Sequence, residues 1–139
     1  MSSARQLFIV TAAMELGAGL TLLVAPAVII SLLFGSAVGT FPAAGVARLT
    51  GGALFALGAA CWWARHDGAS AAARALVGGL LVYNTAVVTL ATVGTLGGPG
   101  PLQWAALAMH AAQAIWCVWV LTHHSESDDR RWPKRSATG

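Results

Sequence analysis

Strongly polar side chains stand inside long apolar stretches of this sequence. They are Glu15, Arg48, Asn84 and His110, and each occupies a different apolar stretch. A carboxyl or an imidazole in such surroundings could exchange protons or bind the polar group of a ligand. An ionisable side chain is costly in apolar surroundings, so each of these positions marks a candidate functional site.

The spacing of polar residues predicts that these side chains share helix faces. Thr11 and Glu15 are four residues apart, and His110 and Gln113 are three apart, so each pair lies on one face of a helix. Polar groups in hydrocarbon need partners, which the interior of a helix bundle supplies. We therefore predict one polar cluster for ligand binding or proton coupling, formed by Glu15, Arg48, Tyr83, Asn84, His110 and Gln113.

The behaviour of Arg48 decides what such a cluster does. If Glu15 and Arg48 pair, with Asn84 and His110 in support, the two charges are tolerable in hydrocarbon and line a static binding pocket. If Glu15 is unpaired, it can carry protons and suits proton-coupled transport. Arg48 could instead extend its long side chain to the membrane surface.

Each polar residue also has a plainer interpretation. Tyr83 and Asn84 could bond across helices as packing contacts, and His110 could be a hydrogen-bonded core residue. His110 has no second histidine at matching spacing within the apolar stretches, so the sequence predicts no metal site there. Cys61 and Cys117 lie in apolar stretches without CxxC or zinc spacing, so we expect buried free thiols.

The composition indicates a membrane protein. Of the 139 residues, 57% are hydrophobic and 9% are charged, whereas soluble domains have about 25% charged residues. At about 20 residues per membrane-crossing helix, the length allows four such helices with short loops. The net charge of +3 comes without a basic patch carrying interleaved aromatics, which excludes nucleic acid. The expected partners are the lipid bilayer and a second copy of the chain.

We predict an all-α fold, a four-transmembrane-helix bundle whose first hydrophobic segment is broken by a proline. The helices are expected at 6–25, 43–64, 75–96 and 102–122. Pro26 lacks an N–H and its ring clashes with the preceding turn, so a short turn or interfacial helix at 28–34 should follow it and end at Gly35. Residues 1–122 would then form the membrane domain and 123–139 a polar cytoplasmic tail.

The basic residues predict the orientation in the membrane. Arg5, Arg65, Arg74 and the cations of the tail all fall on one side of a four-helix arrangement. The two opposite loops, at 36–42 and 97–101, contain no Lys or Arg. Because cytoplasmic loops carry an excess of Lys and Arg, both termini are expected in the cytoplasm, with the bundle in the inner (plasma) membrane.

Parts of the sequence resemble the DoxX-like class of small bacterial four-helix membrane proteins. They are Glu15-Leu16-Gly17-Ala18-Gly19, Pro26 ahead of Leu33-Phe34-Gly35, and the Gly-rich stretch 47–58. The resemblance covers all four helices and implies an accessory subunit of a membrane redox complex, close to a quinone. It carries over no catalytic residue. The residues themselves predict no cofactor, so a quinone enters only through this resemblance.

A second resemblance is to the small multidrug exporters, which are also short four-helix proteins with one Glu in the first span. Glu15 is similar in position. Arg48 departs from that pattern, because a cation inside the membrane would compete with a cationic substrate for Glu15.

Three hypotheses follow, in order of preference. The first is a non-enzymatic membrane protein that binds a small or lipid-like molecule, or a partner subunit, through the polar cluster. The second is a proton-coupled exporter that uses Glu15 as its coupling acid. The third is a membrane enzyme or redox accessory with Glu15 and His110 as acid and base groups. No nucleophile–base pair or cofactor motif supports the third.

Overall fold

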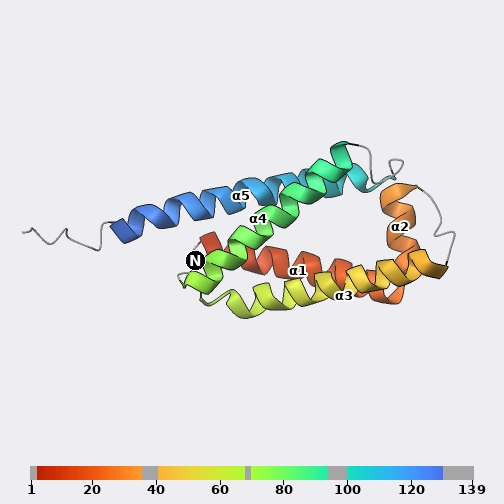
Figure 1. The fold of residues 1–139 in the computed structure, drawn as a ribbon, viewed down its shortest axis with the longest axis horizontal. Helices are drawn as coiled ribbons and strands as arrows, with labels where there is room; N and C mark the ends of the chain where they lie inside the picture. The colour runs from red at the N-terminus through yellow and green to blue at the C-terminus, as the bar shows by residue number, and fades with distance from the viewer. Residues whose placement is uncertain (1–2, 36–40, 68–69, 94–99, 130–139) are drawn as a thin grey trace, which may run out of the picture.

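The structure, a computed structural model, describes residues 3–35, 41–67, 70–93 and 100–129. In these residues the secondary structure is α-helical, in the order α1 (Ser3–Val24), α2 (Pro26–Phe34), α3 (Phe41–Ala64), α4 (Ala71–Thr92) and α5 (Gln103–Asp129) (Figure 1). Within the described ranges, the four helices other than α2 are long and apolar enough to cross a membrane. The prediction of an all-α chain with four long apolar helices is confirmed, and the chain is a multi-pass membrane protein by this criterion.

The long helices pack as two antiparallel pairs. α1 packs along α3, α4 packs along α5, and contacts between the pairs are fewer (Figure 1). The start of α1 and the last turns of α5 lie at the same end of the bundle. The short helix α2 lies across the other end and contacts α1, α3 and α5.

Glycines bring the backbones of α1 and α3 together. A Cβ on Gly19 would lie 2.6 Å from the Phe55 nitrogen, and one on Gly51 would lie 2.8 Å from the Gly19 oxygen. A Cβ on Gly58 would meet the Leu16 nitrogen at 2.8 Å. Helices in membranes associate closely through such small residues, so the α1–α3 pair is a tightly packed unit.

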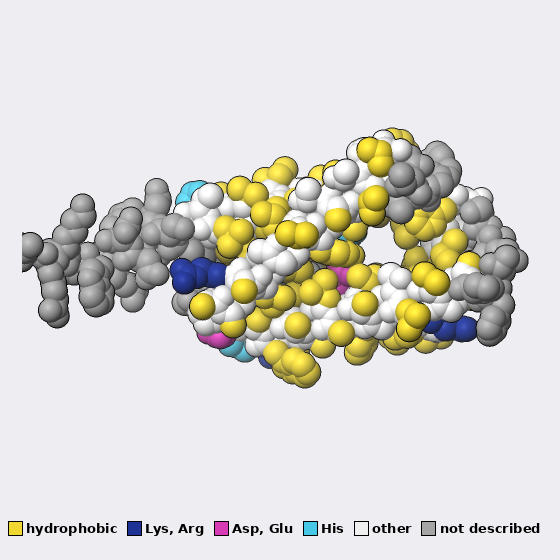
Figure 2. All heavy atoms as spheres, in the orientation of Figure 1, with side chains coloured by type: hydrophobic (Ala, Val, Ile, Leu, Met, Phe, Trp, Pro, Cys, Tyr) yellow, Lys and Arg dark blue, Asp and Glu magenta, His cyan; other side chains and the backbone are white. Residues whose placement is uncertain are grey.

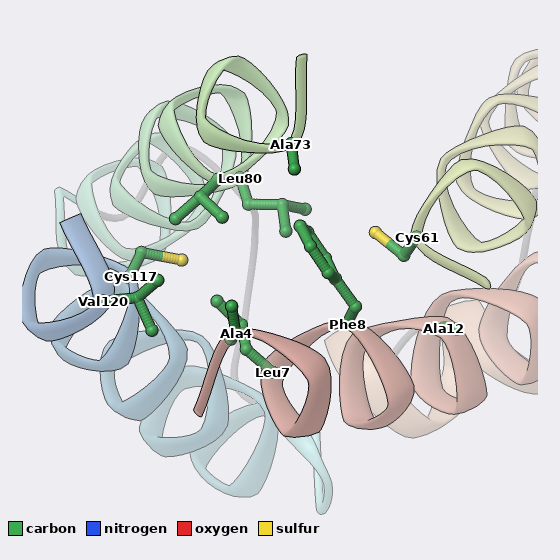
Figure 3. Packing of buried hydrophobic residues seen from close by; sticks show 10 residues of the cluster. Ala4, Leu7, Phe8, Ala12, Cys61, Ala73, Leu80, Cys117 and Val120 are labelled. Atoms are coloured by element: carbon green, nitrogen blue, oxygen red, sulfur yellow. The ribbon is translucent and has the colours of Figure 1, made fainter. Parts of the chain in front are cut away.

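An apolar core joins the two pairs at the end where the chain begins. Figure 3 shows side chains from α1, α3, α4 and α5 meeting there, with Phe8 between Leu80 and Cys61. The buried cluster consists of Ala4, Leu7, Phe8, Ala12, Cys61, Ala73, Val77, Leu80, Cys117 and Val120. Cys61 and Cys117 are buried and free, which confirms the prediction for both thiols.

A backbone clasp joins the pairs at the opposite end. α2 begins with Pro26 in its first turn, where a missing N–H costs no hydrogen bond, and it ends at Gly35 with φ 66°. The carbonyls of Leu33 and Leu32 accept hydrogen bonds from the N–H groups of Gly100 and Leu102, at 2.9 and 3.0 Å. α2 is thereby attached to the beginning of α5.

Several helix boundaries differ from those expected, most at the start of α4 and the end of α5. α4 begins at Ala71, one turn before position 75, because the Ser70 hydroxyl accepts from the Ala73 N–H at 3.0 Å and caps the helix. Its expected end at 96 lies outside the described residues. α5 continues past 122 to Asp129, into the segment assigned to the tail. No Gly or Pro interrupts the sequence before Pro133, so the helix can extend beyond the apolar span.

Candidate ligand-binding site

A cavity of about 740 Å³ separates the two helix pairs on the α2 side of the bundle. Figure 2 shows the molecule hollowed here, between α3 on one side and α4 and α5 on the other, next to α2. Most of the lining is aliphatic. The apolar wall includes Ala18 and Leu22 of α1, Ile29, Ile30 and Leu33 of α2, Val46, Ala47 and Leu54 of α3, Val87 of α4, and Ala106 and Met109 of α5.

Three polar side chains stand at the end of the cavity nearest the core. They are Glu15 of α1, Tyr83 of α4 and His110 of α5. Glu15 is 3% exposed, and the Tyr83 hydroxyl donates a hydrogen bond to its carboxylate. The Tyr83 and His110 rings meet edge to face with centroids 5.6 Å apart. These contacts join α1, α4 and α5 into one polar layer.

Asn84 lies outside the cavity and contacts the His110 ring. The Asn84 side chain, which is 1% exposed, donates from Nδ2 to the Leu80 carbonyl at 2.7 Å. Its Oδ1 lies 2.7 Å from Nδ1 of His110. Both residues belong to the predicted polar cluster, and the structure brings their side chains into contact.

Gln113 lies about one turn beyond His110 on α5 and does not line the cavity. Its Nε2 donates to the sulfur of Met14 at 3.2 Å. In the part of the chain that the structure describes, the Oε1 atom of Gln113 and the hydroxyl of Thr11 are buried without a hydrogen-bond partner. Both residues are nearly fully buried, at 3% and 1% exposure.

The structure does not bring Arg48 to this layer. The Arg48 side chain is exposed on the bundle surface, and its Nε donates to the carbonyl of Leu23 at 3.3 Å. Leu23 follows Glu15 by eight residues, which is about 12 Å along a helix. The described residues show no ion pair between Glu15 and Arg48, so the paired alternative is not the one observed.

Sequence reasoning missed that α2 forms a wall of the cavity. The segment 28–34 was expected to be a turn or an interfacial helix. An interfacial helix needs a polar face, whereas Ser31 is the one polar residue in 28–34. An almost wholly apolar short helix after a proline is the signal that it packs against other helices.

The arrangement has the two parts that an amphipathic ligand needs. An apolar chain can lie against α2 and the diverging helices, while a polar group reaches Glu15, Tyr83 and His110. Among the described residues, no three His, Cys, Asp or Glu side chains come together as a set of metal ligands. Comparison with known proteins found no matching family model, curated protein or solved structure.

Proposed function

We propose that this protein binds a lipid-like, amphipathic molecule in the cavity between its two helix pairs. The observation that supports this function is the cavity itself, which is aliphatic along most of its wall and has Glu15, Tyr83 and His110 at its inner end. A volume of about 740 Å³ falls within the range of about 300–1,000 Å³ found for small-molecule sites.

The surroundings of the cavity favour a ligand that arrives from the bilayer. The hollow is visible on the side of the bundle, across the helix axes, and not along them (Figure 2). In a membrane this side faces hydrocarbon, where a molecule with a long apolar chain is concentrated. The polar layer then gives the ligand's head group hydrogen bonds that the lipid tails cannot supply.

The test fills the cavity with a side chain. Ala106 lines it, whereas the neighbouring Ala105 is exposed and does not. Radiolabelled hexadecanol, hexadecylamine and hexadecyl methyl ether are titrated onto the purified chain in detergent. Ala106→Phe should abolish binding of whichever probes bind the unchanged protein, and Ala105→Phe should leave it intact. If both variants bind as the unchanged protein does, or no probe binds in an Ala106-dependent way, the proposed function is wrong.

A second candidate, a proton-coupled exporter of hydrophobic cations, is favoured by the position of Arg48. The objection to it was that Arg48 would compete for Glu15, and Arg48 instead contacts the Leu23 carbonyl. Glu15 lines a cavity wide enough for a substrate. In reconstituted vesicles, tetraphenylphosphonium should drive proton release that Glu15→Gln abolishes. Absence of release from the unchanged protein would count against transport of this cation.

The sidedness of the protein is also a proposal. We place both termini in the cytoplasm and the chain in the plasma membrane, because Arg5, Arg65 and Arg74 all lie near one end of the bundle. A green fluorescent protein fused after residue 139 should fluoresce, and an alkaline phosphatase fused there should be inactive. The reverse pattern would invert the topology.

The resemblance to the DoxX-like class supports a third proposed role. In this role the chain is an accessory subunit of a membrane redox complex and lies close to a quinone. Its test is co-purification of an oxidoreductase or a quinone with the tagged chain under mild detergent. A preparation free of both would remove the support for this role.

A further inference from the structure

The hydrogen bonds of two buried residues, Asn84 and His110, indicate which head group the cavity accepts. We infer that the polar group of the ligand is a hydrogen-bond donor, such as an alcohol, a phenol or an amine. This inference rests on the proposed binding function and adds the chemistry of the head group to it.

Asn84 is held in one orientation by its own helix. The Leu80 carbonyl can only accept a hydrogen bond, so the atom of Asn84 that lies 2.7 Å from it must be the amide nitrogen. The amide oxygen therefore points away from Leu80, toward Nδ1 of His110 at 2.7 Å. With 1% of Asn84 exposed, water does not compete for either contact.

The orientation of Asn84 decides which nitrogen of His110 carries the proton. An amide oxygen only accepts, so Nδ1 of His110 must be protonated. In the part of the chain that the structure describes, no carboxylate forms an ion pair with His110, and an unpaired charge is costly among apolar helices. The ring is then neutral, and its other nitrogen, Nε2, has a free lone pair.

The Nε2 lone pair lies on the side of the His110 ring that faces the cavity. Asn84 covers the Nδ1 side of the ring and does not line the cavity, whereas His110 does. Within the described ranges, Nε2 has no protein hydrogen-bond partner and is not one of the buried unpartnered atoms. Nε2 is therefore an acceptor available to a ligand.

Glu15 and Tyr83 reinforce this preference. The Tyr83 hydroxyl uses its proton for the Glu15 carboxyl group, whose oxygens retain further lone pairs beside the cavity. A head group that enters here meets acceptors on both Glu15 and His110. An ether, an ester or a ketone offers no donor, and would displace water without satisfying them. Asn84 acts as a positioning residue, because it sets the tautomer of His110 without contacting the ligand.

The tautomer is measured directly on the full chain, without a ligand. Solid-state NMR of the protein labelled with ¹⁵N-histidine, in lipid bilayers, should show Nδ1 of His110 protonated and Nε2 unprotonated. The signal is assigned by its loss in His110→Phe. Asn84→Asp should keep Nδ1 protonated, since a carboxylate also accepts from Nδ1–H, and Asn84→Leu should remove this preference. An Nε2-protonated His110 in the unchanged protein overturns the inference.

The head-group preference is measured with probes that share one apolar chain. Hexadecanol or hexadecylamine should bind about tenfold more tightly than hexadecyl methyl ether, as expected for one hydrogen bond to a buried acceptor. The difference should disappear in His110→Phe. Preference for the alcohol assigns a neutral hydroxyl, and preference for the amine assigns an ammonium; each supports a donor head group.

The outcomes separate this inference from the proposed function. If all three probes bind equally and all are lost in Ala106→Phe, the cavity binds ligands but the donor inference is wrong. If the ether binds more tightly than both donors, the inference is likewise overturned. If no probe binds in an Ala106-dependent way, the proposed function itself fails.

Discussion

At the scale of single residues, Arg48 has a structural role at the end of α1. The last carbonyls of a helix have no partner within it, and Leu23 lies in the last turn of α1. The Arg48 guanidinium donates to the Leu23 carbonyl at 3.3 Å. A cation at a helix C-terminus is favourable, so Arg48 stabilises the end of α1.

A double-mutant cycle tests whether Arg48 acts independently of Glu15. Arg48→Ala should lower the free energy of unfolding by about 0.3–1 kcal/mol. Combined with Glu15→Gln, the two effects should add to within about 0.5 kcal/mol, as for distant residues. Equilibrium unfolding in mixed micelles measures both, with Arg48→Lys as the charge-preserving control. A coupling energy well above that limit would mean that Arg48 and Glu15 do pair.

At the scale of helices, the α1–α3 pair depends on contacts that leave no room for a side chain. A Cβ on Gly51 would lie 2.8 Å from the Gly19 oxygen and 2.9 Å from the Leu23 nitrogen. These are backbone atoms, which cannot move aside as a flexible side chain can. The neighbouring Gly52 has open space around it.

Alanine at these two glycines should therefore have opposite effects. Gly51→Ala should lower the free energy of unfolding by about 1–3 kcal/mol through overpacking. Gly52→Ala should leave stability unchanged or raise it by up to about 1 kcal/mol, because Ala favours a helix. Thermal unfolding of the two variants side by side measures the difference. Equal losses would show that α1 and α3 do not pack through Gly51.

Gly100, in the clasp between α2 and α5, also has no room for a side chain. A Cβ there would overlap the backbone of Leu32 and Leu33, whose carbonyls accept the hydrogen bonds that hold the clasp. Gly100→Ala should release α2, and the amides of Gly100 and Leu102 should exchange hydrogen faster. Gly45→Ala is the control, because a Cβ at Gly45 meets nothing within 4 Å. Unchanged exchange at these two amides in Gly100→Ala would contradict the clasp.

At the scale of the whole molecule, the cavity exists because the two pairs are joined by the core and the adjacent polar layer, and again at α2, but not between the polar layer and α2. The apolar core joins them at one end, and the clasp through α2 joins them at the other. Between these attachments the pairs diverge, and all five described helices line the resulting cavity. A ligand in it would contact both pairs at once.

Ligand binding should therefore stabilise the folded bundle. A donor probe such as hexadecanol, at about 100 times its dissociation constant, should raise the free energy of unfolding by about 2.7 kcal/mol if it binds only the folded state. Ala106→Phe should show no such increase at the same probe concentration. A probe that stabilises both proteins equally would be acting through the detergent and not through the cavity.

The sequence by itself determined the class of the protein and which apolar stretch carries each of its polar groups. Four long apolar stretches, broken by Pro26 and by Gly- and Pro-containing loops, leave few options other than membrane-crossing helices. Asn84 and His110 lie in the third and fourth of these stretches, and both were assigned to one polar cluster because polar groups in hydrocarbon need partners. The structure brings these two side chains within hydrogen-bond distance of each other.

Only the tertiary structure decided which way each side chain points and where the helices separate. The long side chain of Arg48 could reach inward or toward the end of α1, and the orphan carbonyl of Leu23 that accepts from it exists only once α1 has ended. Gly19, Gly51 and Gly58 hold α1 close to α3. At the far end of the bundle, α2 lies between this pair and α5, and the cavity forms beside it. Both outcomes depend on contacts between distant parts of the chain. Glu15 therefore lies beside a cavity and hydrogen-bonded to Tyr83, and not against Arg48.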